Sequence, residues 1–67
     1  MKQFYFYPCT KTGKMKKGFC RCIGSAYDLL KTLNDWRKFA KRFNLKYYAF
    51  KPADGDMYTV VELFPQN

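Results

Sequence analysis

The side chains that could do chemistry in this chain are mostly cations: it has thirteen Lys and Arg, five Asp and Glu, three Cys and no His. Catalysis near neutral pH usually depends on a histidine or on a carboxylate with a shifted pKa. The closest carboxylate pair, Asp54 and Asp56, flanks a glycine in a stretch typical of a turn. We therefore expect no catalytic residues and no enzymatic activity.

Three cysteines, Cys9, Cys20 and Cys22, raise the question of a disulfide or a metal site. An odd number gives no complete disulfide framework, which small secreted domains usually need. Zinc sites commonly combine two Cys-x-x-Cys pairs or histidines, whereas this chain has the shorter spacing Cys20-Arg21-Cys22. The cysteines therefore predict free thiols in a reducing cytoplasm, with no metal and no other cofactor.

The positive charge is concentrated in one part of the chain. Residues 1–51 hold all thirteen Lys and Arg and two carboxylates, whereas residues 52–67 hold three carboxylates and no base. The formal net charge is +8. A field of this sign and asymmetry favours an anionic partner, either nucleic acid or an acidic protein surface.

The clearest of the elements that must position these groups is a helix over residues 26–43. Its apolar side chains recur at intervals of three and four, and Leu33 and Trp36 lie at the centre of the stripe. Ser25 is a good N-cap, and Asn44 tolerates the left-handed conformation that ends many helices. The residues expected to face the core are Ala26, Leu29, Leu33, Trp36, Ala40 and Phe43.

Alternating aromatic and β-branched residues predict two strands before the helix and two after it. The first runs over residues 2–8 and the second over 15–23, which makes a long hairpin with a basic tip. The last two, at 46–51 and 57–64, are joined by an acidic turn. All of residues 1–67 should form a single two-layer α+β domain, ββαββ in order, with a four-stranded, mainly antiparallel sheet and the amphipathic helix on one face.

The chain shows no sign of a membrane segment or a leader sequence. It has no apolar run approaching the ~20 residues that cross a bilayer. Its N-terminus alternates polar and aromatic residues instead of forming the apolar core of a signal peptide. We therefore expect no association with a membrane.

One helix covers one face of a sheet, so the other face should be open. In the last predicted strand, the charge of Glu62 assigns its alternate neighbours, including Tyr58, to that open face. In the first strand, Tyr5 and Tyr7 tolerate water better than the phenylalanines beside them. The open face should carry Tyr5, Tyr7 and Tyr58, and the same alternation can add Tyr47.

Two groups of cations accompany these tyrosines. Rings stack on bases, and cations attract phosphates, so the two kinds of side chain together predict a protein that binds nucleic acid, either DNA or RNA. A basic two-stranded ribbon would also fit the DNA major groove. The predicted interface comprises Lys11, Lys14, Lys16, Lys17 and Arg21 in the hairpin, Lys31, Arg37, Lys38, Lys41 and Arg42 in the helix, and Tyr5 and Tyr7 in the sheet.

Three alternatives stay open. Lysines in a turn can simply be solvated, and tyrosines on a sheet can serve strand pairing alone. The open sheet face could instead be an interface, in a homodimer or with another protein. In size and lack of motifs the chain is similar to many small phage- or plasmid-encoded accessory proteins, so the same side chains could dock on a larger host protein or nucleoprotein complex and inhibit or modulate it.

Overall fold

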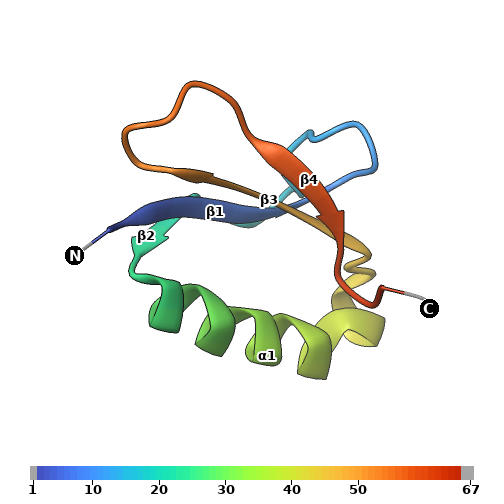
Figure 1. Ribbon diagram of the computed structural model, residues 1–67. Helices are drawn as coiled ribbons and strands as arrows, with labels where there is room; N and C mark the ends of the chain where they lie inside the picture. Colours follow the sequence, from blue (N-terminus) through green and yellow to red (C-terminus); the bar gives the residue numbers. More distant parts are fainter. Residues whose placement is uncertain (1, 66–67) are drawn as a thin grey trace.

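Four antiparallel strands and one helix make up the structure, a computed structural model that describes residues 2–65. The elements are β1 (Phe4–Cys9), β2 (Cys22–Gly24), α1 (Ala26–Phe43), β3 (Tyr47–Pro52) and β4 (Thr59–Glu62). The sheet order is β2-β1-β3-β4, and every neighbouring pair is antiparallel. Figure 1 shows α1 on one face of the sheet and the loops rising on the other. The predicted two-layer α+β fold is therefore confirmed.

The helix α1 begins and ends where the sequence predicts. The Ser25 hydroxyl accepts a hydrogen bond from the Asp28 backbone N–H at 3.3 Å, and the Asp28 carboxylate accepts one from the Ser25 backbone N–H at 2.9 Å. This reciprocal pair is a capping box. At the other end Asn44 is left-handed, with φ 55 and ψ 49. The two caps fix the bounds of the helix.

The core between α1 and the sheet is small and partly aromatic. The ring of Phe6 meets the edge of Trp36 with centroids 6.2 Å apart. Phe43 was predicted to face this core, but it is 47% exposed. The chain turns back at Asn44, so Leu45 occupies the buried position instead. The buried cluster consists of Phe6, Leu33, Trp36, Ala40, Leu45 and Leu63, with Leu29 packed against it.

The predicted second strand over residues 15–23 is wrong, because β2 spans only Cys22–Gly24. Alternate residues of β1 direct their backbone groups toward β2. Pro8 belongs to that set, since its carbonyl accepts a hydrogen bond from the Lys16 N–H at 3.0 Å. Proline has no N–H to return, so regular pairing is interrupted there, and beyond Pro8 only an isolated bridge joins Cys9 to Met15. Residues 10–21, which we call the basic loop, leave the sheet as an irregular segment with a positive φ of 90 at Gly18.

The remaining strands are confirmed with altered ends. β1 and β3 begin and end one or two residues later than predicted, and β4 is shorter than the predicted 57–64. Met57 and Thr59 were assigned to the core side, yet Met57 is 81% exposed and Thr59 is also exposed. Leu63, just beyond β4, is fully buried as the alternation predicts.

Candidate nucleic-acid interface

The strand register places the predicted tyrosines on the sheet face opposite α1. Tyr5 lies across from Ile23 on β2 and Lys51 on β3, and Tyr7 lies across from Ala49. Residues directly opposite in an antiparallel sheet share a face, and Phe6, between the two tyrosines, belongs to the helix-side core. The predicted orientation of Tyr5 and Tyr7 is confirmed. Tyr47 is on the same face, across from Cys9.

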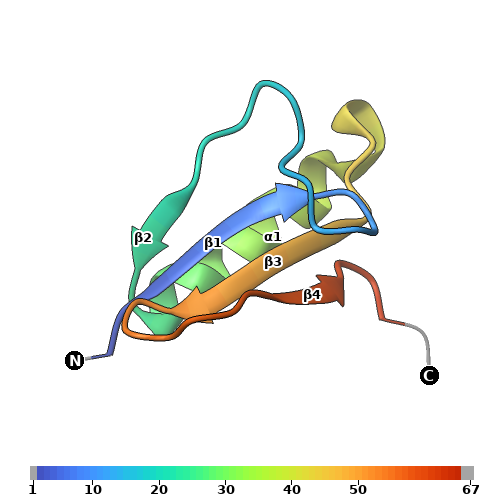
Figure 2. The ribbon, with the colours of Figure 1, turned by 90° about the horizontal axis from the view of Figure 1, so that it is seen from above.

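This face is not fully open, contrary to the prediction. Cys9 and Ala49 both belong to it, and they are 1% and 0% exposed. The first turn of the basic loop covers them. The Tyr7 hydroxyl donates to the Gly13 carbonyl at 2.9 Å, and a Cβ on Gly13, whose φ is 91, would come within 3.3 Å of Val60. Figure 2, which looks down on this face, shows the turn crossing the start of β3.

Tyr7 is engaged in holding that turn in place. Its ring packs against Tyr58, with centroids 5.0 Å apart. Burial, together with the nearby Cys9 thiol and Tyr58 hydroxyl, raises the pKa of Tyr7. The Tyr58 hydroxyl is buried and has no hydrogen-bond partner within residues 2–65. The middle of the face is thus packed against the loop, which leaves less of it for the predicted homodimer.

Tyr5 lies between two cations at the other end of this face. The Arg21 guanidinium is 4.5 Å and the Lys51 ammonium 4.9 Å from the centroid of its ring. Lys51 also donates to the Gly55 carbonyl at 2.9 Å. The structure therefore brings the predicted Arg21 next to the predicted Tyr5. Lys51 was missed, although it follows Ala49 at the strand period.

Four of the five predicted helix cations are exposed, namely Lys31, Lys38, Lys41 and Arg42. The exception is Arg37, which is half-buried, and its Nε donates to the Leu63 carbonyl at 2.8 Å. This hydrogen bond ties α1 to the segment after β4. Arg37 therefore has a structural role that the sequence did not indicate.

The basic loop reaches the C-terminal end of α1 through three phenylalanines. The ring of Phe19 is 5.9 Å from that of Phe43, and Phe39 is 6.5 Å from Phe43 on the same helix. Phe39 and Phe43 are 45% and 47% exposed. The Arg42 guanidinium lies 5.5 Å from the centroid of Phe43. We call Phe19, Phe39 and Phe43 the phenylalanine ridge; Figure 2 shows the outer part of the loop arching toward that end of α1.

The ridge brings together cations that are distant in the sequence. The Phe19 N–H donates to the Lys16 carbonyl at 3.2 Å, so Lys16 and Lys17 lie in the turn that leads into Phe19. Lys17 is exposed and Lys16 is half-buried. These two lysines thus lie next to Phe19 in the chain, in the turn that leads into the ridge. Lys11 and Lys14 are also exposed, but they lie at the other end of the loop, beside the turn over the sheet.

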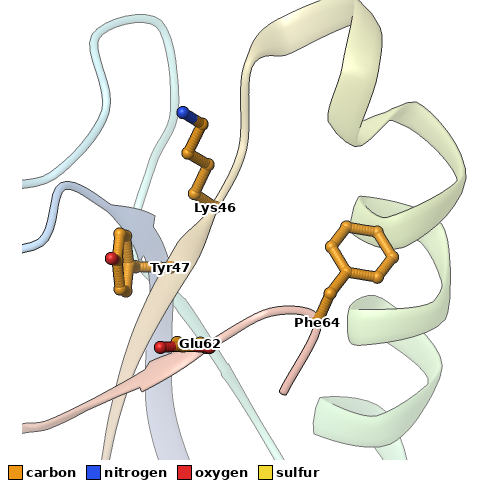
Figure 3. Close-up of a pocket in the computed structure, with 4 residues that line it drawn as sticks. All are labelled: Lys46, Tyr47, Glu62 and Phe64. Atoms are coloured by element: carbon orange, nitrogen blue, oxygen red, sulfur yellow. The ribbon is translucent and has the colours of Figure 1, made fainter. Parts of the chain in front are cut away.

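A hollow at the opposite edge of the sheet is lined by Lys46, Tyr47, Glu62 and Phe64. Figure 3 shows that their side chains do not converge, since Phe64 points toward α1 and Lys46 points away from Glu62. Within residues 2–65, no group of three or more Cys, Asp or Glu could hold a metal ion. In the same part of the chain, no helix is long and apolar enough to cross a membrane.

Relatives do not indicate a function for this chain. Comparisons with models of protein families, with curated proteins and with solved structures found no match. Only the residues and their geometry remain as guides to what the protein binds.

Proposed function

We propose that this protein binds nucleic acid, without catalysis, through the exposed cations of the basic loop and α1. Eight of the ten cations predicted for this role are exposed, and Lys16 and Arg37 are half-buried. The chain has thirteen Lys and Arg against five Asp and Glu, so at least eight cations lack a carboxylate of their own. Such cations can neutralise phosphates and release the counterions around them, which supplies most of the affinity of non-specific binding.

The observation that carries the proposal is the meeting of two basic segments at one exposed aromatic cluster. Phe19 packs on Phe43, and Arg42 lies over the same ring. The part of the loop that carries Lys16 and Lys17 is therefore held next to the last turn of α1, whereas Lys11 and Lys14 lie at the other end of the loop. Phe19 also packs against the core, so the fold itself keeps this part of the loop in place.

We also propose that the protein works in the cytoplasm, where thiols stay reduced. Cys22 pairs with Phe6, which faces the helix side, whereas Cys9 lies on the other face of the sheet. Side chains that point to opposite faces cannot be joined by a disulfide without moving the backbone. The structure thus offers no bond between the two sheet cysteines that would favour an oxidising compartment.

Fluorescence anisotropy with short labelled duplex DNA, single-stranded DNA and single-stranded RNA, at several salt concentrations, tests the proposal. We expect binding to at least one ligand, weakening by about tenfold or more between roughly 50 and 200 mM salt. Arg42→Gln should weaken binding, whereas Lys2→Gln, an equal loss of charge at an exposed position near the N-terminal end of α1, should not. If micromolar protein shows no salt-dependent binding to any ligand, the proposal is wrong and an acidic protein surface becomes the partner to seek.

A further inference from the structure

The phenylalanine ridge combines Phe19, which packs against the core, with two phenylalanines of α1 that the core does not use. Phe39 and Phe43 are outside the buried cluster, and about half of each side chain faces solvent. Large aromatic side chains that are exposed next to one another commonly mark a binding site. Phe19 supports Phe43 from the loop with its ring at 90° to it. These rings can contact a partner directly, and they are exposed to water when no partner is bound.

The charges around the ridge favour an anionic partner. Lys38 and Arg42 are four residues apart on α1 and so are neighbours on its surface. Lys16 and Lys17 precede Phe19 in the turn that leads into the ridge. α1 also brings one carboxylate close to it, that of Asp35, four residues before Phe39. The four nearby cations outnumber this carboxylate, and rings beside cations match a polyanion that also carries planar bases.

The spacing of the rings selects unpaired bases over stacked ones. The centroids are 5.9 Å and 6.5 Å apart, with interplanar angles of 90° and 65°. Bases along one strand of a duplex follow each other about every 3.4 Å and are parallel. Tilted rings at nearly twice that spacing cannot continue such a stack, but an exposed ring, above all that of Phe39, can receive one base that has swung out of it. Accordingly, we infer that the phenylalanine ridge is a stacking site for the bases of single-stranded nucleic acid, an inference that rests on the proposed function.

The tyrosines on the sheet are less suited to this task. Tyr7 is tied to Gly13 and packed on Tyr58, and Tyr5 lies beneath Arg21 and Lys51. Stacking a base on either ring requires moving a group that already covers it. The ridge requires no such movement at Phe39, which is 45% exposed.

The test compares Phe39→Ala and Phe43→Ala with the parent by anisotropy, using a labelled single-stranded oligonucleotide and a duplex of the same length at low salt. Each variant should lose about fivefold or more in affinity for the single strand, the effect expected for one stacked base. Affinity for the duplex should change by less than about twofold. Phe39→Tyr keeps the ring and should bind like the parent. Phe39→Leu keeps an apolar side chain but has no ring on which a base can stack, so it should bind like Phe39→Ala. Phe64→Ala, which removes a 53% exposed ring at the opposite edge, is the matched control and should have no effect.

Two results would overturn the stacking site while leaving the proposed function intact. One is a Phe39→Ala variant that binds the single strand as tightly as the parent; the other is an equal loss for single strand and duplex. Failure of the parent to bind any nucleic acid would overturn both proposals. Circular dichroism melts must show each variant folded, and if Phe43→Ala fails that check, the Phe39 series decides alone.

Discussion

The rings of Tyr7 and Tyr58 pack against each other at an interplanar angle of 51°, yet only one of the two hydroxyls has a hydrogen-bond partner in the part of the chain that the structure describes. That of Tyr7 donates to the Gly13 carbonyl at 2.9 Å, whereas that of Tyr58 is buried with no partner within residues 2–65. Removing the Tyr7 hydroxyl loses a hydrogen bond, whereas removing the Tyr58 hydroxyl eliminates a buried polar atom that has no partner among these residues. We expect Tyr7→Phe to lower the free energy of unfolding by about 1 kcal/mol and Tyr58→Phe to leave it unchanged or raise it slightly. Urea melts of the two variants measure this, and equal destabilisation would contradict the assigned contacts.

Asp28 makes the stability of the helix start depend on pH. Hydrogen bonds from the Ser25 backbone N–H, and then from its hydroxyl, hold the pKa of Asp28 below its ordinary value of 3.8. A lowered folded-state pKa contributes stability above the unfolded value, and this contribution is lost as the pH falls through the folded value. Asp28→Asn should therefore lower the melting temperature near pH 7, and the difference from the parent should shrink toward about pH 2. A difference that does not vary with pH would show that the charge of the carboxylate is not involved.

The three thiols should differ in reactivity in a way that follows their burial. Cys20 is exposed, Cys22 is half-buried and Cys9 is buried, and burial raises the pKa of both Cys22 and Cys9. Since the thiolate is the reactive form, alkylation of the native protein without reductant should modify Cys20 first and Cys9 last. Mass spectrometry over time gives the order. A bond between Cys9 and Cys20 would contradict the prediction of free thiols.

Among the elements, the bounds of α1 could be predicted, although Ala26 and Phe43 at its two ends are exposed and not in the core as expected; the basic loop could not be predicted. The apolar repeat and the capping residue at each end all lie within or next to the helical segment itself. They indicate its extent, and the observed bounds are the predicted ones. The loop over residues 10–21 contains alternating residues that resemble a strand, but its pairing depends on Pro8 in the neighbouring strand. The residue pattern of the loop alone does not show that Pro8, its pairing residue in β1, lacks a backbone N–H. Nor does it show that the first turn folds back over the tyrosines.

The phenylalanine ridge was missed for a related reason. The apolar repeat includes Phe43, so periodicity assigned it to the core, but a repeat does not show where the sheet beneath the helix ends. Leu45, past the cap, takes the buried place. The available signal was a pair of phenylalanines four apart beside Arg42, at the margin of the apolar stripe. Exposure of four of the five helix cations, by contrast, followed directly from their position on the polar face, and Arg37 is the exception.

Two leucines three residues apart test the packing of α1. Leu33 is 3% exposed in the core, whereas Leu30 is 61% exposed. An aspartate at position 33 would bury a charge without a partner, at a cost comparable to the whole stability of a small domain. Leu33→Asp should therefore abolish the cooperative thermal transition, and Leu30→Asp should keep it within a few degrees of the parent. Cooperative unfolding of Leu33→Asp near the parent temperature would mean that the buried face of the helix is misassigned.

At the scale of the whole molecule, the fold keeps most of the basic loop away from the acidic C-terminal part of the chain. The sheet order places β2 and β4 at opposite edges. The basic loop leads into β2, while Asp54, Asp56 and Glu62 belong to the turn before β4 and to β4 itself. The part of the loop next to β2 thus lies at the edge opposite these carboxylates, while the turn that carries Lys11 and Lys14 crosses the sheet as far as Val60 of β4. A polyanion should approach the β2 side and be repelled from the β4 side, which orients the protein on its ligand.

The salt dependence of binding to a single strand tests the central claim most directly. Each phosphate neutralised contributes about −0.7 to the slope of log K against log salt. The parent should give a slope of about −2 or steeper, since Lys16, Lys17 and Arg42 each lie within three residues of a ridge phenylalanine. Lys17→Gln combined with Arg42→Gln should reduce its magnitude by about 1.4, while Lys2→Gln, at the other end of the molecule, should leave it unchanged. A parent slope near zero, or an equal loss of slope in Lys2→Gln, would contradict the assignment of this surface to nucleic acid.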